Sequence, residues 1–204
     1  MKINDVMYTK GSVRPEFVNL ATGRTMSWDD RHNTLTYSAS MAMAAAFGGD
    51  PRHIPNRIGF IYGSGDSSQE SVSTSFDRNQ TWESLRNDLG DDKDVQIRPF
   101  SYSPSMKTTE KTDSSSSSSS SSDVDAKFYS VTFHACSDSQ TPGAIHPDSG
   151  KIFTADMRVY QAVLLNVTGD DKTVLARVSL ADGGTYKSKP KDFEIALDWT
   201  IKFF

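Results

Sequence analysis

The stretch Phe193-Glu-Ile-Ala-Leu-Asp-Trp-Thr-Ile-Lys-Phe203 decides the fold class of this chain of 204 residues. Large apolar side chains stand at every second position, namely Phe193, Ile195, Leu197, Trp199, Ile201 and Phe203. The positions between them hold Glu194, Ala196, Asp198, Thr200 and Lys202. Because successive side chains of a strand point to opposite faces, this alternation predicts an antiparallel strand with one buried face. A helix with the same spacing would spread its aromatic side chains around its whole circumference.

Other segments along the chain have the composition of strands or short helices. Strands are expected over residues 13–20, 33–37, 57–62, 128–133, 159–166 and 173–178, and a hairpin loop over 168–172. Pro15 favours an edge strand or the start of a strand. Helices are expected over 38–47, with a serine cap, and over 81–90, with Thr81 as the cap. Many strands and few helices predict a mainly β fold: a single antiparallel β-sandwich or jelly-roll-like domain with two short helices.

A composition shift divides the chain at residues 101–125, where nine consecutive serines follow a polar stretch. No apolar residue there repeats with the period of a helix or strand, so little apolar surface can offset the entropy of ordering. We expect a long Ser-rich surface loop or linker. The predicted organisation is residues 1–100 as the first half of the sandwich, 101–126 as the loop, and 127–204 as the second half.

Net charge and hydropathy exclude several classes of protein. The formal net charge is −4 with an isoelectric point near 5.5, which gives no general attraction to nucleic acid or anionic lipid. The longest apolar run, residues 41–47, is too short to cross a bilayer, and the N-terminus lacks the apolar core of a signal peptide. We expect a soluble protein that is not secreted by that route, without nucleic-acid or membrane partners.

Catalysis needs a nucleophile next to a base, paired carboxylates or a metal cage. The histidines are far apart in the sequence and lack zinc-like spacing to one another or to the single cysteine: His32, His53, His134 and His146. We expect structural or solvent-exposed roles for them. Cys136 has no Lys or Arg next to it in the sequence, which favours a buried structural thiol.

One acidic cluster is a candidate calcium site, formed by Asp88, Asp91, Asp92 and Asp94. The cluster lacks the glycine and the glutamate that an EF-hand loop places at fixed positions, so a solvated loop at a helix end is the favoured interpretation. The sequence therefore predicts no catalytic residue, no metal, no cofactor and no enzymatic activity.

Three segments in order resemble bacteriophage tail-fibre and related tail structural proteins: Asn33–Gly49, Arg57–Gly65, and the strand pair at 159–166 and 173–178. The similarity covers about half of the chain and departs from the family at the serine run and in the absence of a long repetitive shaft. The resemblance implies a virion structural protein, a tail or fibre-anchoring adaptor subunit that is assembled in the host cytoplasm. It implies other virion proteins as partners and a homo-oligomer.

Two other functions stay open at this point. A capsid decoration protein would use the same sandwich, and a carbohydrate-binding module would need a groove lined by aromatic side chains such as Trp28 and Trp82. For both tryptophans the alternative role is core packing. The candidate partner interface consists of these two tryptophans with Lys107, Lys111, Ser114, Ser115, Ser116, Ser117, Ser118, Ser119, Ser120, Ser121 and Ser122.

Overall fold

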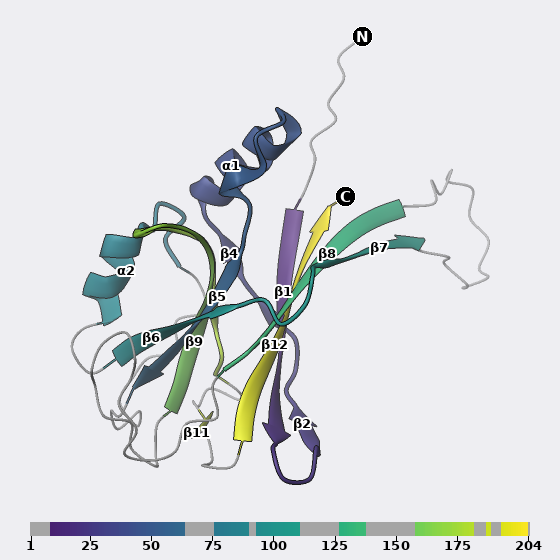
Figure 1. The fold of residues 1–204 in the computed structure, drawn as a ribbon, viewed down its shortest axis with the longest axis vertical. Coiled ribbons are helices and arrows are strands. Elements are labelled where there is room, and N and C mark those ends of the chain that lie inside the picture. The colour runs from purple at the N-terminus through teal and green to yellow at the C-terminus, as the bar shows by residue number, and fades with distance from the viewer. Residues whose placement is uncertain are drawn as a thin grey trace, which may run out of the picture.

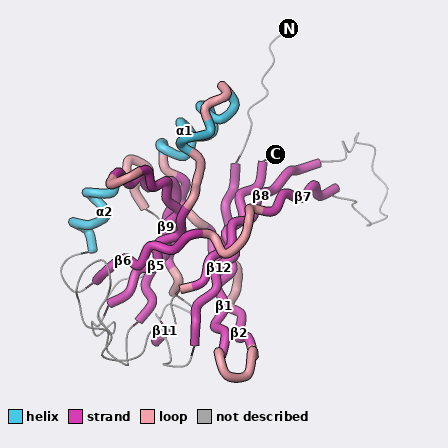
Figure 2. Tube along the Cα trace, viewed as in Figure 1, coloured by secondary structure: helices cyan, strands magenta, loops and turns pink. Residues whose placement is uncertain are grey.

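The structure is a computed structural model that describes residues 9–63, 76–89, 93–110, 127–137, 158–181, 187–188 and 193–203. Its elements are mostly strands, arranged in two antiparallel sheets, with two α-helices beside them (Figure 2). The prediction of a mainly β sandwich with two short helices is confirmed. Within the described residues, no helix has the length and hydrophobicity that a membrane span requires.

The first sheet, here called sheet A, has the strand order β2-β1-β12-β8-β7, and β3 also pairs with β1. Its strands are β1 (Thr9–Asn19), β2 (Thr25–Ser27), β3 (Arg31–His32), β7 (Ser105–Glu110), β8 (Lys127–Cys136) and β12 (Phe193–Phe203). The alternating C-terminal stretch is β12, in the middle of the sheet. Trp199 lies between Val13 of β1 and Phe133 of β8, and all three side chains are buried. The predicted inward face of this strand is therefore confirmed.

The second sheet, sheet B, has the order β4-β10-β9-β5-β6, and β11 also pairs with β9. Its strands are β4 (Thr34–Leu35), β5 (Arg57–Gly63), β6 (Lys93–Pro99), β9 (Arg158–Thr168), β10 (Asp171–Ser179) and β11 (Lys187–Ser188). The predicted hairpin loop joins β9 to β10, with Gly169 at a φ of 60°. Both sheets contain strands from before and after the serine run (Figure 1).

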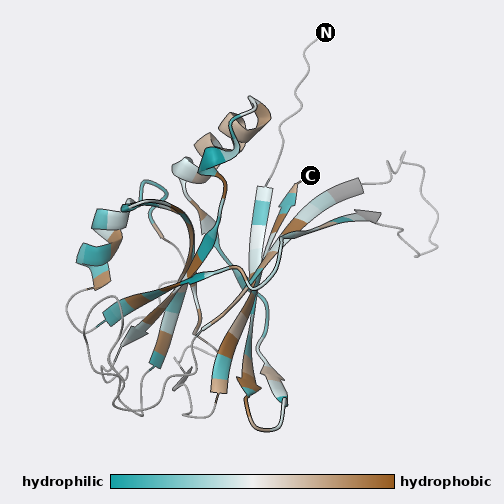
Figure 3. Cartoon of the chain, viewed as in Figure 1, coloured by the Kyte–Doolittle hydropathy of each residue, from teal (hydrophilic) through white to brown (hydrophobic). Residues whose placement is uncertain are grey.

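The main core lies between the two sheets. Phe60 and Leu164 of sheet B pack in one cluster with Leu197 and Trp199 of sheet A, and all four side chains are fully buried. Figure 3 shows apolar residues concentrated along the central strands, while polar residues alternate with them. Burial of this apolar surface is the main force that holds the two sheets together.

Helix α2 (Trp82–Leu89) covers the other face of sheet B. Leu85 and Leu89 are buried against Ile61, Tyr160 and other residues of that sheet, so sheet B is buried on both faces. The Ser84 backbone N–H donates to Thr81 Oγ1 at 3.1 Å, which confirms the predicted cap. The outer face of sheet A has no such helix among the described residues.

Helix α1 (Tyr37–Phe47) differs from its prediction at the N-terminus. The cap is Thr36, whose hydroxyl oxygen accepts from Ala39 N, and not one of the serines. The same hydroxyl donates to carbonyls of β10 (2.7 Å to Val174 O), which fixes the start of α1 on sheet B. The strand expected over residues 33–37 is consequently reduced to β4, because Thr36 and Tyr37 belong to the helix start. The 3₁₀ helix η1 (Pro51–His53) follows α1.

The prediction of an edge strand or strand start at Pro15 is wrong, because Pro15 lies within β1, between β12 and β2. The Pro15 carbonyl accepts a hydrogen bond from Trp28 N at 3.0 Å. The nitrogen and carbonyl oxygen of one strand residue point to the same side, so the Pro15 nitrogen faces away from β12. On that side of β1, β3 pairs with Ser12 and Val13, and β2 pairs with residues 16–18. The Pro15 nitrogen lies in the gap between these two short strands, so the N–H that proline lacks is not needed for pairing.

Two further predictions are corrected by strands that the apolar pattern did not indicate. Residues 105–110 form β7 inside the segment expected to be a loop, because this strand is held by backbone pairing with β8 and buries few apolar side chains. Asp94 is buried in β6 and not in a solvated loop, and its carboxylate accepts from Arg86 Nη1 at 3.1 Å. The neighbouring Asp91 and Asp92 lie outside the described residues.

Candidate functional site

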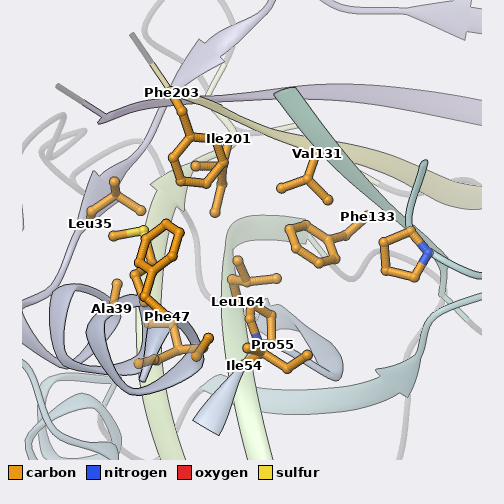
Figure 4. Close-up of a pocket in the computed structure, with 15 residues that line it drawn as sticks. Leu35, Ala39, Phe47, Ile54, Pro55, Val131, Phe133, Leu164, Ile201 and Phe203 are labelled. Atoms are coloured by element: carbon orange, nitrogen blue, oxygen red, sulfur yellow. The ribbon is translucent and has the colours of Figure 1, made fainter. Parts of the chain in front are cut away.

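An apolar pocket of about 290 Å³ lies between helix α1 and the inner face of sheet A (Figure 4). Phe47, Ile54 and Leu35 form one side, and Val131, Phe133 and Phe203 form the other. The remaining lining residues are also apolar: Ala39, Ala42, Met43, Ala46, Pro55, Pro104, Leu164, Leu175 and Ile201. Since no charged side chain lines it, the pocket favours an uncharged apolar occupant.

The sequence of α1 explains why a hollow exists here. The helix face toward the sandwich carries Ala39, Ala42 and Ala46, whose methyl groups leave space that larger side chains would fill. Thr36 and Leu175 hold the N-terminal half of the helix on β10. The helix is thus fixed at a distance from sheet A, and the pocket remains between them.

The apolar surface continues beyond the pocket. On the helix side, Phe47 lines the pocket and is still 76% exposed. On the sheet side, Met106 pairs with Val131 and is 80% exposed. Paired residues of neighbouring strands share a face, so Met106 lies on the inner face of sheet A, which sheet B does not cover at this end. We call the pocket together with these exposed side chains the open end of the sandwich.

A second, polar cluster lies on the outer face of sheet A. His134 of β8 is paired with Asp198 of β12, and its Nδ1 lies 2.7 Å from Asp198 Oδ1. Its Nε2 lies 3.4 Å from the sulfur of Cys136, two residues further along the same strand face. The ring of Tyr102 stacks on the imidazole, with 4.7 Å between the ring centroids and 12° between the planes.

The contacts of His134 set its protonation. The hydrogen bond with Cys136 is the largest cause that raises its pKa, burial acts in the opposite direction, and the Asp198 carboxylate raises it further, to about 9. The imidazole is therefore charged at neutral pH in the folded protein. Cys136 is partly exposed and contacts His134, so the prediction of a buried structural thiol is wrong.

A polar pocket of about 270 Å³ adjoins this cluster on the same face. Arg14 and Lys107 bring positive charge to it, and Asp30 and Asp198 bring negative charge. Arg14 Nε lies 3.0 Å from Asp30 Oδ1. Charges of both signs next to one another give this face no net preference for an anion or a cation.

The structure separates the two tryptophans that were candidates for an aromatic groove. Trp28 is buried in the core between the sheets, edge-on to Phe17 at 4.9 Å between the ring centroids. Trp82 is partly buried on α2, at the far face of sheet B, with Lys172 Nζ 5.6 Å from its ring centroid. They do not line a common groove.

Of the other predicted interface residues, the structure describes only Lys107. This side chain is exposed on β7 and lines the polar pocket. Lys111 and Ser114–Ser122 lie outside the described residues. Within the described part of the chain, no group of three or more His, Cys, Asp or Glu side chains is placed to hold a metal ion.

Sequence reasoning missed the contact of Cys136 with His134 because the predicted strand ended at residue 133. A strand that continues to residue 136 places residues 134 and 136 on one face, and this i, i+2 spacing is the signal that was available. The contribution of Asp198 could not be found in this way, because it depends on the register between β8 and β12.

Comparisons with protein-family models, with curated proteins and with solved structures give no match to this chain.

Proposed function

We propose that this protein is a non-enzymatic structural subunit of a bacteriophage virion, a tail or fibre-anchoring subunit that binds a neighbouring protein through the open end of its sandwich. The observation that carries the binding role is the apolar pocket with its exposed rim. The resemblance of residues 33–49, 57–65, 159–166 and 173–178 to tail structural proteins supports the virion as the setting.

The exposed rim favours a protein as the occupant over a small molecule. Phe47 stands on α1, Met106 on β7 and Tyr129 on β8, and all three side chains are exposed. A small ligand that filled the pocket would leave these large side chains in water. Apolar surface that extends from a pocket onto separate elements is typical of a protein interface.

The edge of sheet A favours an extended segment of the partner. β7 lies at the edge of sheet A. It pairs with β8 on one side, and no strand of the described residues pairs with it on the other side. A partner segment can pair with this edge through its backbone and direct every second side chain toward the pocket. We therefore expect an uncharged segment with alternating apolar side chains from another virion protein.

The test is incorporation of variants into particles. Phe47→Glu places a charge at the pocket rim, at a side chain that is already exposed, so folding should be retained while binding is lost. Ala44→Glu is the matched control, because Ala44 is exposed on the same helix and does not line the pocket. Circular dichroism melting curves establish that both variants fold.

Mass spectrometry of purified particles then measures the copies of each variant. We expect Ala44→Glu to be incorporated like the wild type and Phe47→Glu to be depleted by about tenfold or more. About six or twelve copies of the wild type per particle support a tail position, whereas copies on the order of hundreds indicate capsid decoration. Equal incorporation of both variants would exclude the open end as the interface, and absence of the wild-type protein from particles would exclude the virion role.

A further inference from the structure

The cluster of Cys136, His134 and Asp198 is independent of the open end, because it lies on the opposite face of sheet A. In this cluster the imidazole of His134 is hydrogen-bonded to the thiol of Cys136 on one side and to the carboxylate of Asp198 on the other. A carboxylate can only accept hydrogen bonds, so Nδ1 of His134 carries a proton toward Asp198. Nε2 is thereby directed at the Cys136 sulfur, where it takes the thiol proton or, once protonated, donates to the thiolate.

The backbone holds this geometry in place. The His134 carbonyl accepts from Ser101 N at 2.8 Å, which brings the adjacent Tyr102 onto the imidazole ring. Just beyond Cys136, Ser137 N donates to the Ile195 carbonyl at 2.8 Å, and Ser137 Oγ accepts from Ile195 N. A strand fixed on both sides keeps the sulfur and the imidazole at contact distance without further ordering.

Other charged and titratable groups face the cluster from the neighbouring strands. Asp198 faces His134 from β12, and Arg14 of β1 stands beside Asp198 with its own partner Asp30. Arg98 of β6 donates from Nε to the Cys136 carbonyl at 3.3 Å, which ties the end of β8 to sheet B. The pKa of Tyr102 is raised, chiefly by burial, so this ring is neutral.

We infer that Cys136 is a nucleophilic thiol site for disulfides, activated by His134 and with Asp198 as a positioning residue. In the step, the Cys136 sulfur attacks one sulfur of a disulfide R–S–S–R. The new Cys136–S–S–R bond forms as the old S–S bond breaks, and the leaving thiolate takes up the proton that His134 carries. The attacking thiol is oxidised and the leaving sulfur is reduced, so the disulfide itself is the only oxidant.

The composition of the chain determines the fate of the product. Cys136 is the only cysteine, so no second thiol of the same chain can resolve the mixed disulfide. The product is a stable covalent adduct, either with a small thiol or with a cysteine of another protein. The site is thus one of modification or covalent linkage, and it does not require turnover.

The single cysteine also makes the test specific. The folded protein is mixed with dithiodipyridine at pH 6, and release of pyridinethione is followed by absorbance, with the same chain unfolded in urea as the reference. An ordinary thiol of pKa about 8.5 is less than about 1% ionised at this pH. We expect the folded protein to react about tenfold faster or more, and an equal or slower rate would overturn the inference.

Variants assign the effect to its groups. His134→Gln should lower the rate at pH 6 to that of the unfolded chain, and Asp198→Asn should give an intermediate rate. His32→Gln is the control, because His32 is exposed on β3 and outside the cluster. An unchanged rate in His134→Gln would refute the role of the imidazole. If that variant does not fold, the pH dependence of the wild-type reaction with dithiodipyridine decides. A reaction rate nearly constant from pH 6 to 8 supports activation of Cys136 by His134, and an approximately tenfold rise per pH unit excludes it.

A last experiment separates the two sources of disulfide. Incubation with glutathione disulfide, followed by mass spectrometry of the intact chain, detects an adduct with a small thiol. Non-reducing electrophoresis of purified particles, if the protein is found there, detects a link to another protein. Both readouts are independent of Phe47, so failure here leaves the proposed virion interface unaffected.

Discussion

Trp199 offers the most direct test of how the core is built. It is fully buried in the centre of sheet A and belongs to the cluster between the two sheets. Its indole Nε1 is buried and has no hydrogen-bond partner among the described residues. The residue therefore combines a large favourable term, burial of its ring, with an unfavourable one, an unpaired N–H group.

The magnitudes follow from these two terms. A tryptophan buries about 150–250 Å², worth about 4–6 kcal/mol at 25 cal/mol per Å². Trp199→Ala should lower the free energy of unfolding by about 3–5 kcal/mol, because removal of the unpaired N–H offsets part of the lost burial. Trp199→Phe keeps most of the ring and removes the unpaired N–H, whose burial costs about 1–3 kcal/mol. We expect Trp199→Phe to change stability by less than about 1 kcal/mol, because loss of area and gain from the N–H nearly cancel.

Urea titration followed by far-UV circular dichroism measures both variants, since this signal does not depend on the tryptophan that is removed. Glu194→Ala is the control on the outward face of the same strand, with an expected cost under about 0.5 kcal/mol. A loss of 3 kcal/mol or more in Trp199→Phe would refute the cancellation. A loss in Trp199→Ala no larger than in the control would refute the inward orientation of the strand.

Three other predictions concern the polar network under α2, the cluster on sheet A and the serine run. Arg177 is buried and donates to Gln161 and Gln80. Arg177→Ala should lower the free energy of unfolding in the same urea titration, because each glutamine oxygen left without a donor costs about 1–3 kcal/mol, and a total cost under about 1 kcal/mol would contradict a structural network. The His134 imidazole should titrate by NMR near pH 9 in the wild type and at lower pH in Cys136→Ser, because the hydrogen bond with Cys136 is the largest cause that raises its pKa. Equal midpoints in the two proteins would exclude Cys136 as the cause of the raised pKa. Deletion of residues 114–122 should leave the melting temperature within about 3 °C of the wild type, because serines contribute almost no apolar area, and a larger fall would show that the segment is structural.

Local periodicity predicted the elements whose burial repeats along the chain. The alternation in β12 and the spacing of Leu85 and Leu89 in α2 each describe one face of one element, and both faces are buried as expected. β6 and β7 were not found. β6 is buried partly by α2, and β7 is held by its backbone pairing with β8, so neither has a clean apolar alternation of its own.

The sequence by itself determined the β class, the inward face of β12 and the presence of two short helices, because these follow from side-chain spacing along a single segment. Only the tertiary structure decided what those faces meet. The register of β8 with β12 brings His134 to Asp198. The position of α1 on β10, fixed by Thr36, leaves the apolar pocket open. The physical reason is that periodicity records whether a side chain is buried, whereas a site requires side chains from distant segments to converge, and only strand pairing and packing fix that convergence.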